Sequence, residues 1–123
     1  MAKILLIDDE VLIRKSLRRG LEKEGHYIEE ASNGKEALKI IDREFELVIT
    51  DIFMPEMDGL ETLKEIKERY PEIKIIAISG YESEHNGNVP DFLKFAKAFG
   101  AIKVFKKPFQ LAEVLEAVRK LLK

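Results

Sequence analysis

The sequence predicts an α/β fold in which five parallel strands form one doubly wound sheet in the order 2-1-3-4-5. Short apolar runs alternate along the chain with amphipathic stretches of helical period. Most of these runs are continuously apolar, which is typical of parallel strands that are covered on both faces. Right-handed crossovers make this strand order the most economical for 123 residues.

The elements follow in chain order from these patterns. We expect strands at Ile4–Ile7, His26–Ala31, Leu47–Ile49, Ile73–Ile78 and Ile102–Phe105. Apolar residues at helical spacing mark the inward faces of three helices: Ile13, Leu17 and Leu21; Leu60, Leu63 and Ile66; Leu111, Val114, Leu115, Val118 and Leu122. Asn33 precedes Glu36 by three residues, which is the spacing of a helix capping box, and Gly59 marks the expected start of the third helix. A fourth helix is expected near Phe92–Phe99, after a polar loop at Gly80–Phe92.

Length and composition predict a single domain over residues 1–123, with no output domain after it. The formal charge of -2 gives no overall attraction to nucleic acid or to an anionic membrane, but whole-chain charge says little about partners. We expect no direct contact with nucleic acid or membrane. The sequence contains no cysteine, no signal peptide pattern and no apolar run long enough to cross a membrane. We therefore expect a cytoplasmic protein.

Polar residues gather where the predicted strands end. Asp8, Asp9 and Glu10 follow the first strand, and Asp51 follows the third. Ser79 comes after the fourth strand, and Lys106 and Lys107 come after the fifth. In open parallel sheets, binding sites form beyond these strand ends, near the switch point between the first and third strands. Crowded carboxylates repel one another and need a cation, and several hard oxygen ligands suit Mg²⁺.

Four motifs at these strand ends resemble the receiver domains of two-component response regulators, which are CheY-like domains. The motifs are "IDDE" (Ile7–Glu10), "DIFMPEMDG" (Asp51–Gly59), "ISG" (Ile78–Gly80) and "GAIKVFKKPF" (Gly100–Phe109). Their order and spacing extend the resemblance over nearly the whole chain. The resemblance implies a flavodoxin-like (βα)5 fold, in agreement with the pattern of strands and helices.

The resemblance also implies a role for each site residue. Asp51 would be both the phosphoacceptor and a Mg²⁺ ligand. Asp9 would be a direct Mg²⁺ ligand, Asp8 a ligand through water, and the carbonyl of Phe53 a further ligand. Ser79 and Lys107 would bind the phosphoryl group. The phosphoryl donor would be the phosphohistidine of a histidine kinase or phosphotransfer protein, and a downstream target protein would receive the signal. The domain would catalyse its own phosphorylation and dephosphorylation and have no other enzymatic activity.

Other function classes fit the same residues less well. A flavin mononucleotide site would need a small polar loop after the first strand, where Asp8 and Asp9 would repel the phosphate. A haloacid dehalogenase type of hydrolase would need an acid at position 53, which is phenylalanine. A serine hydrolase elbow would need glycines two residues on either side of Ser79, where alanine and tyrosine occur. Purely structural roles remain open for single residues, such as helix capping by Asp8 and Asp9.

One departure from the family pattern leaves a second function open. Receiver domains usually carry an aromatic residue three positions before the conserved lysine, and here that position is Val104. Its β-branched side chain is stiff, and strand alternation turns the neighbouring Phe105 to the opposite face. We therefore expect signalling to run through Gly80–Phe92 and the helix after it. The alternative function is a receiver-like interaction module that is never phosphorylated.

Overall fold

The computed structural model describes residues 1–52, 59–79 and 96–122, with the side chain of Ser79 left out. It confirms a five-stranded parallel sheet in the order β2-β1-β3-β4-β5. The strands are β1 (Lys3–Ile7), β2 (Tyr27–Ala31), β3 (Leu47–Asp51), β4 (Lys74–Ser79) and β5 (Lys103–Lys106). The sequence patterns located each strand to within one or two residues. The predicted order is the one that right-handed crossovers favour.

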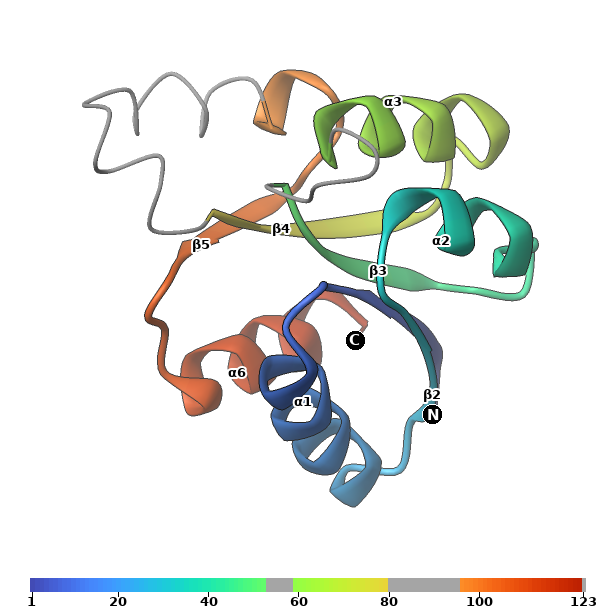
Figure 1. Ribbon diagram of the computed structural model, residues 1–123. Helices are drawn as coiled ribbons and strands as arrows, with labels where there is room; N and C mark the ends of the chain where they lie inside the picture. The colour runs from blue at the N-terminus through green and yellow to red at the C-terminus, as the bar shows by residue number, and fades with distance from the viewer. Residues whose placement is uncertain (53–58, 80–95, 123) are drawn as a thin grey trace.

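Helices cover both faces of this sheet. They are α1 (Val11–Lys23), α2 (Gly34–Ile40), α3 (Gly59–Arg69) and α6 (Leu111–Leu121). Figure 1 shows α1 and α6 together on one face and α2 and α3 together on the other. Residues 96–98 are helical, but most of the fourth predicted helix and all of the Gly80–Phe92 loop lie outside the described residues. Among the helices that are described, none has the length and apolar character needed to cross a bilayer.

The sheet divides the hydrophobic core into two layers. Successive residues of a strand point to opposite faces, so Leu5 and Val48 pack on the side of α2 and α3, whereas Leu6 and Ile49 pack on the side of α1 and α6. All four side chains are at most 1% exposed. Burying each contributes about 1.5–3 kcal/mol relative to leaving it in water. The central strands are therefore rigid supports for whatever follows their carboxyl ends.

The prediction that the fifth strand is buried on both faces is wrong. Among the described strands, β5 lies at the edge of the sheet and pairs only with β4. Its first and last residues, Lys103 and Lys106, are exposed, and Ile102, just before it, is 49% exposed. An edge strand has a neighbour on one side only, so an apolar run does not by itself guarantee full cover. The expected alternation holds, because Val104 packs in the α2 and α3 layer and Phe105 in the α1 and α6 layer.

The start of α2 confirms the predicted capping box. The Asn33 side chain accepts a hydrogen bond from the Glu36 backbone N–H at 2.7 Å. Glu36 in turn accepts one from the backbone N–H of Ser32, one residue before the cap. These bonds satisfy donors that a helix start would otherwise leave unpaired. They also set the direction in which the chain leaves β2, next to the carboxyl end of the sheet.

Candidate functional site

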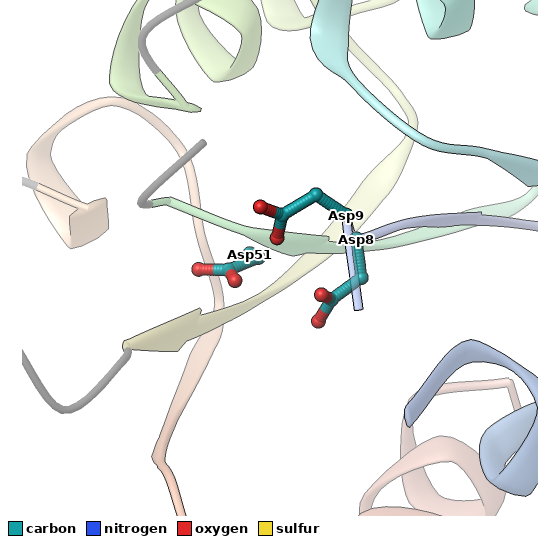
Figure 2. Close-up of side chains that lie close together, drawn as sticks. All are labelled: Asp8, Asp9 and Asp51. Carbon is teal, nitrogen blue, oxygen red and sulfur yellow. The ribbon is translucent and has the colours of Figure 1, made fainter. Parts of the chain in front are cut away.

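The register of the sheet brings the predicted acidic residues together. Ile7 of β1 pairs with Thr50 of β3, so Asp8 and Asp51, the next residue on each strand, come to lie next to one another. Asp9 follows Asp8 in the turn toward α1. Carboxylate oxygens of Asp8, Asp9 and Asp51 all lie within 4.8 Å of one another, beyond the strand ends (Figure 2). The structure thus assembles the three predicted aspartates into one cluster.

Burial separates these three carboxylates into two kinds. Asp8 and Asp51 are only 2% and 3% exposed, whereas Asp9 is open to solvent. Burial raises the pKa of Asp8 above its ordinary value, although a hydrogen bond from the Glu10 backbone N–H and the charge of Lys107 oppose the change. The sheet therefore holds acids where an ionised carboxylate is costly, which is unusual unless a cation balances them.

The helix-capping alternative for Asp8 and Asp9 is wrong. The residue at the N-cap of α1 is Glu10, and its side chain makes no capping hydrogen bond. Asp8 Oδ1 instead accepts a bond of 2.8 Å from the Glu10 backbone N–H, which closes a tight turn within the loop. This local bond uses one oxygen of Asp8 and leaves the other directed into the cluster.

Lys107 supplies positive charge to the cluster from the loop after β5. Its Nζ lies 2.8 Å from Asp51 Oδ2, 3.1 Å from Asp8 Oδ2 and 2.5 Å from Glu10 Oε2. The side chain is 11% exposed. Burial would lower the pKa of Lys107, but hydrogen bonds to Asp51 and Glu10 outweigh it and raise that pKa above the ordinary value. Lys107 is therefore a charged ammonium held against the carboxylates.

The residues present fit a hard divalent cation. In the part of the chain that the structure describes, the Lys107 ammonium pairs with the carboxylates of Asp8, Glu10 and Asp51, and Asp9 adds a further acid to the cluster, so these acids outnumber it. Asp8 Oδ2 is buried and accepts no well-directed hydrogen bond from any described residue, although it is in ion-pair range of Lys107. An oxygen of this kind has unused ligand capacity. Oxygen donors on an open rim are the set that Mg²⁺ takes, with water in its remaining positions.

The structure does not describe the functional groups of two predicted site residues, Ser79 and Phe53. Ser79 is the last residue of β4 and pairs in register with Lys106, so its backbone ends at the same edge of the sheet. Its side chain lies outside the described residues, as does the whole of Phe53. Their roles remain predictions.

Sequence reasoning missed three contacts around the cluster. It placed Glu10 at the sheet edge but gave it no role, and the structure pairs it with Lys107. It also missed Arg14, which donates to the Asp8 carbonyl, and Glu30, which binds Arg14. The available signal was a pair of acids, Glu29 and Glu30, inside the weakly apolar second strand. A charge at a semi-buried strand position usually has a partner.

A family model for the response regulator receiver domain matches residues 4–119. The chain belongs to this family. The predicted fold class and the predicted function class, a receiver domain of a two-component system, are thereby confirmed.

Relatives agree with this assignment. Sporulation initiation phosphotransferase F of Bacillus subtilis (strain 168) is 38% identical over 121 residues, covering 98% of this chain and 93% of that protein. Sensor kinase CckA of Brucella abortus (strain 2308) is 36% identical over 125 residues, but this chain spans only 12% of its length. A CheY-like receiver domain protein from Methanospirillum hungatei JF-1 has a crystal structure that superimposes with a TM-score of 0.84 at 33% identity, over 98% of this chain and 94% of that one.

Proposed function

We propose that Asp51 accepts a phosphoryl group from a phosphohistidine and that Mg²⁺, bound by the neighbouring aspartates, is required. The observation that carries this proposal is the cluster itself, in which Asp8, Asp9 and Asp51 offer oxygens within 4.8 Å of one another while Lys107 Nζ lies 2.8 Å from Asp51. A phosphoryl group that approaches Asp51 would therefore meet a fixed cation. Membership of the receiver domain family supports the same assignment.

The reaction is a transfer between two side chains. A carboxylate oxygen of Asp51 forms a bond to phosphorus while the bond from phosphorus to the donor's imidazole nitrogen breaks, and the histidine keeps that electron pair and takes up a proton. The product is an acyl phosphate on Asp51. Attack by water at phosphorus later restores the carboxylate and releases inorganic phosphate. We propose that the domain accelerates both steps by holding charges in place.

Like charges set the main barrier. Two unit negative charges about 4 Å apart repel by roughly 4 kcal/mol at the effective dielectric of a protein surface. Lys107 offsets part of this repulsion because its ammonium is already in contact with the Asp51 carboxylate. When bound, Mg²⁺ supplies further positive charge at the phosphoryl oxygens and lowers the same repulsion. Positioned cations of this kind account for most of the acceleration in phosphoryl transfer.

The individual roles follow burial and position. Asp9 is exposed at the rim, as suits a direct metal ligand, whereas the buried Asp8 is suited to binding the metal through water. The carbonyl of Phe53 as a further ligand and the hydroxyl of Ser79 as a phosphoryl-binding group complete the proposal on the strength of their motifs.

Partners follow from the chemistry of the donor. We propose a histidine kinase or a phosphotransfer protein as donor and a separate protein as target, with no direct contact to nucleic acid or membrane. A relative named as a phosphotransferase supports a place in a phosphorelay. A cytoplasmic location is part of the same proposal. Transmission through residues 80–99 also remains a prediction, and amide exchange there that is unchanged by a phosphoryl analogue would overturn it.

A small-molecule phosphodonor tests the proposal. We expect incubation with acetyl phosphate and Mg²⁺ to add the mass of one phosphoryl group to the wild-type chain. We expect no addition to Asp51→Asn or to wild type in excess chelator. The matched control is Asp42→Asn, which removes an exposed acid that pairs with Lys3. If neither wild type nor control takes up phosphate, the chain is an unphosphorylated interaction module.

A further inference from the structure

Arg14 connects the acidic turn to two other elements of the fold. It lies in the first turn of α1, and its Nη1 donates a hydrogen bond of 2.6 Å to the backbone carbonyl of Asp8. Its Nε donates a second bond, of 2.9 Å, to Oε1 of Glu30 on β2. The Arg14 and Glu30 side chains are only 13% and 9% exposed. One guanidinium therefore spans the gap between β2 and the turn that follows β1.

Glu30 holds this guanidinium firmly. It lies on the same face of β2 as Ile28, which packs against α1, so its carboxylate is directed at the helix. Its second oxygen accepts hydrogen bonds from Lys15 at 3.0 Å and from Arg18 at 2.7 Å. A carboxylate bound by three cations of one helix loses much of its rotational freedom. The orientation of the Arg14 guanidinium is restricted in turn, because this planar group binds the carboxylate in one orientation.

The backbone that Arg14 holds carries the proposed metal ligands. The Asp8 N–H donates to the Ala31 carbonyl at 3.1 Å, and the Asp8 side chain closes the turn to Glu10. Arg14, on α1, adds a hydrogen bond to the backbone carbonyl of Asp8. The peptide between Asp8 and Asp9 is thus restrained on the side that faces α1. Moving that peptide would move both carboxylates relative to Asp51.

We infer that Arg14, anchored by Glu30, is a positioning residue that sets the affinity of the Asp8 and Asp9 turn for Mg²⁺. This inference rests on the proposed function, because it assumes that the aspartate cluster binds the metal. Arg14 binds neither metal nor phosphoryl group in this account. It acts through the Asp8 backbone, in the way that outer partners of metal ligands commonly tune affinity.

The sign of the effect separates positioning from simple electrostatics. Arg14 is a cation near a cation site, so removing its charge should tighten Mg²⁺ binding if charge alone matters. Removing a positioning bond should weaken binding, because the ligands lose their arrangement. Arg19 provides the matched control, since it carries the same charge on α1 but is exposed and makes no bond to Asp8 or Glu30 in the described structure.

Mg²⁺ dissociation constants measured from amide chemical shifts test the inference. We expect Arg14→Gln to raise the dissociation constant by about tenfold, the low end of the range for outer partners of ligands. We expect Arg19→Gln to leave the dissociation constant unchanged or lower it. Arg14→Lys should fall between wild type and Arg14→Gln, because an ammonium cannot make both bonds in the same geometry. Equal or tighter binding by Arg14→Gln would overturn the inference.

Two further outcomes keep the tests distinct. If Arg14→Gln does not fold, Arg14→Lys serves instead, because it keeps the charge at position 14 but cannot make both bonds in the same geometry. Weaker Mg²⁺ binding by that variant supports the inference, and unchanged binding overturns it. If wild type shows no saturable Mg²⁺ binding, or Asp9→Asn binds as well as wild type, the proposed metal site fails and the inference fails with it. Wild-type binding that requires Asp9 but not Arg14 leaves the proposed function standing and removes only the role of Arg14.

Discussion

Replacing Lys107 with methionine removes the ammonium from a buried group of acids while keeping a side chain of similar length. Asp51 Oδ2 and Asp8 Oδ2 lie 2.8 Å and 3.1 Å from Nζ, and both aspartates are almost fully buried. At an effective dielectric of about 20, each contact corresponds to roughly 5–6 kcal/mol of Coulomb energy. The net loss must be smaller, because the variant no longer pays to desolvate the lysine.

Protonation sets an upper limit on that loss. A stranded carboxyl can take up a proton, and protonating a carboxyl of ordinary pKa, about 4, costs about 4 kcal/mol at pH 7. We therefore expect Lys107→Met to lower the free energy of unfolding by about 3 kcal/mol at pH 7 without Mg²⁺. For a chain of this size, that corresponds to a fall in melting temperature of about 10 °C.

The pH dependence has a definite sign. In the variant, we expect the Asp8 and Asp51 carboxyls to have a higher pKa in the folded state than in the unfolded state. Their protonated forms therefore stabilise the folded variant at low pH, and this stabilisation is lost as pH rises through the folded pKa. The difference between wild type and Lys107→Met should shrink from pH 7 to pH 5. Urea unfolding in the presence of chelator, monitored by circular dichroism, measures the loss of stability at pH 7 and at pH 5. The control is Lys64→Met, on the exposed side of α3. A loss below about 1 kcal/mol, or one that is equal at both pH values, would refute this reasoning.

Two other predictions concern stability. Burial acts to raise the pKa of Glu30, but hydrogen bonds from Arg18, Arg14 and Lys15 prevail and lower it from 4.5 to about 2. The ionised Glu30 carboxylate therefore contributes fully to the free energy of unfolding above pH 4.5, and this contribution is lost as pH falls toward 2. We expect urea unfolding to show that Glu30→Gln costs about 1–2 kcal/mol at pH 7 but little at pH 2. An equal cost at both pH values would count against this prediction. In Gly34→Ala, the new Cβ would lie 1.9 Å from the buried Thr62 Oγ1, so we expect a loss of about 2 kcal/mol. Gly20→Ala, where the nearest atom is 3.3 Å away, should be close to neutral, and similar urea midpoints for the two variants would contradict this reading.

The position of the acidic cluster was predictable because it depends on few variables. Once two apolar runs are assigned to neighbouring parallel strands, the residues that follow them must meet at one edge. Asp8 and Asp51 needed only this rule, and the register of Ile7 with Thr50 bears it out. Lys107 needed the same rule for β5, together with a side chain long enough to reach across β4 to the cluster.

The contacts that were missed depend on more variables. The bond from Arg14 to Asp8 depends on how far α1 is rotated about its own axis. The bond from Arg14 to Glu30 depends in addition on the register of β2 against β1. No periodicity in a single sequence specifies either quantity. The exposed outer residues of β5 were missed for a related reason. The predicted strand order already placed the fifth strand at the edge of the sheet. How far its residues are covered depends on the packing of the neighbouring helices, which an apolar run does not specify.

Chemical trapping locates the phosphoryl group most directly. Borohydride reduces an aspartyl phosphate to homoserine, so the modified position can be read by mass spectrometry of peptides after phosphorylation with acetyl phosphate and Mg²⁺. We predict homoserine at position 51 in the wild-type chain and none in reactions that contain excess chelator. Homoserine at position 8 or 9 instead, or no trapped product from a chain that has gained phosphate, would contradict the assignment of Asp51 as the phosphoacceptor.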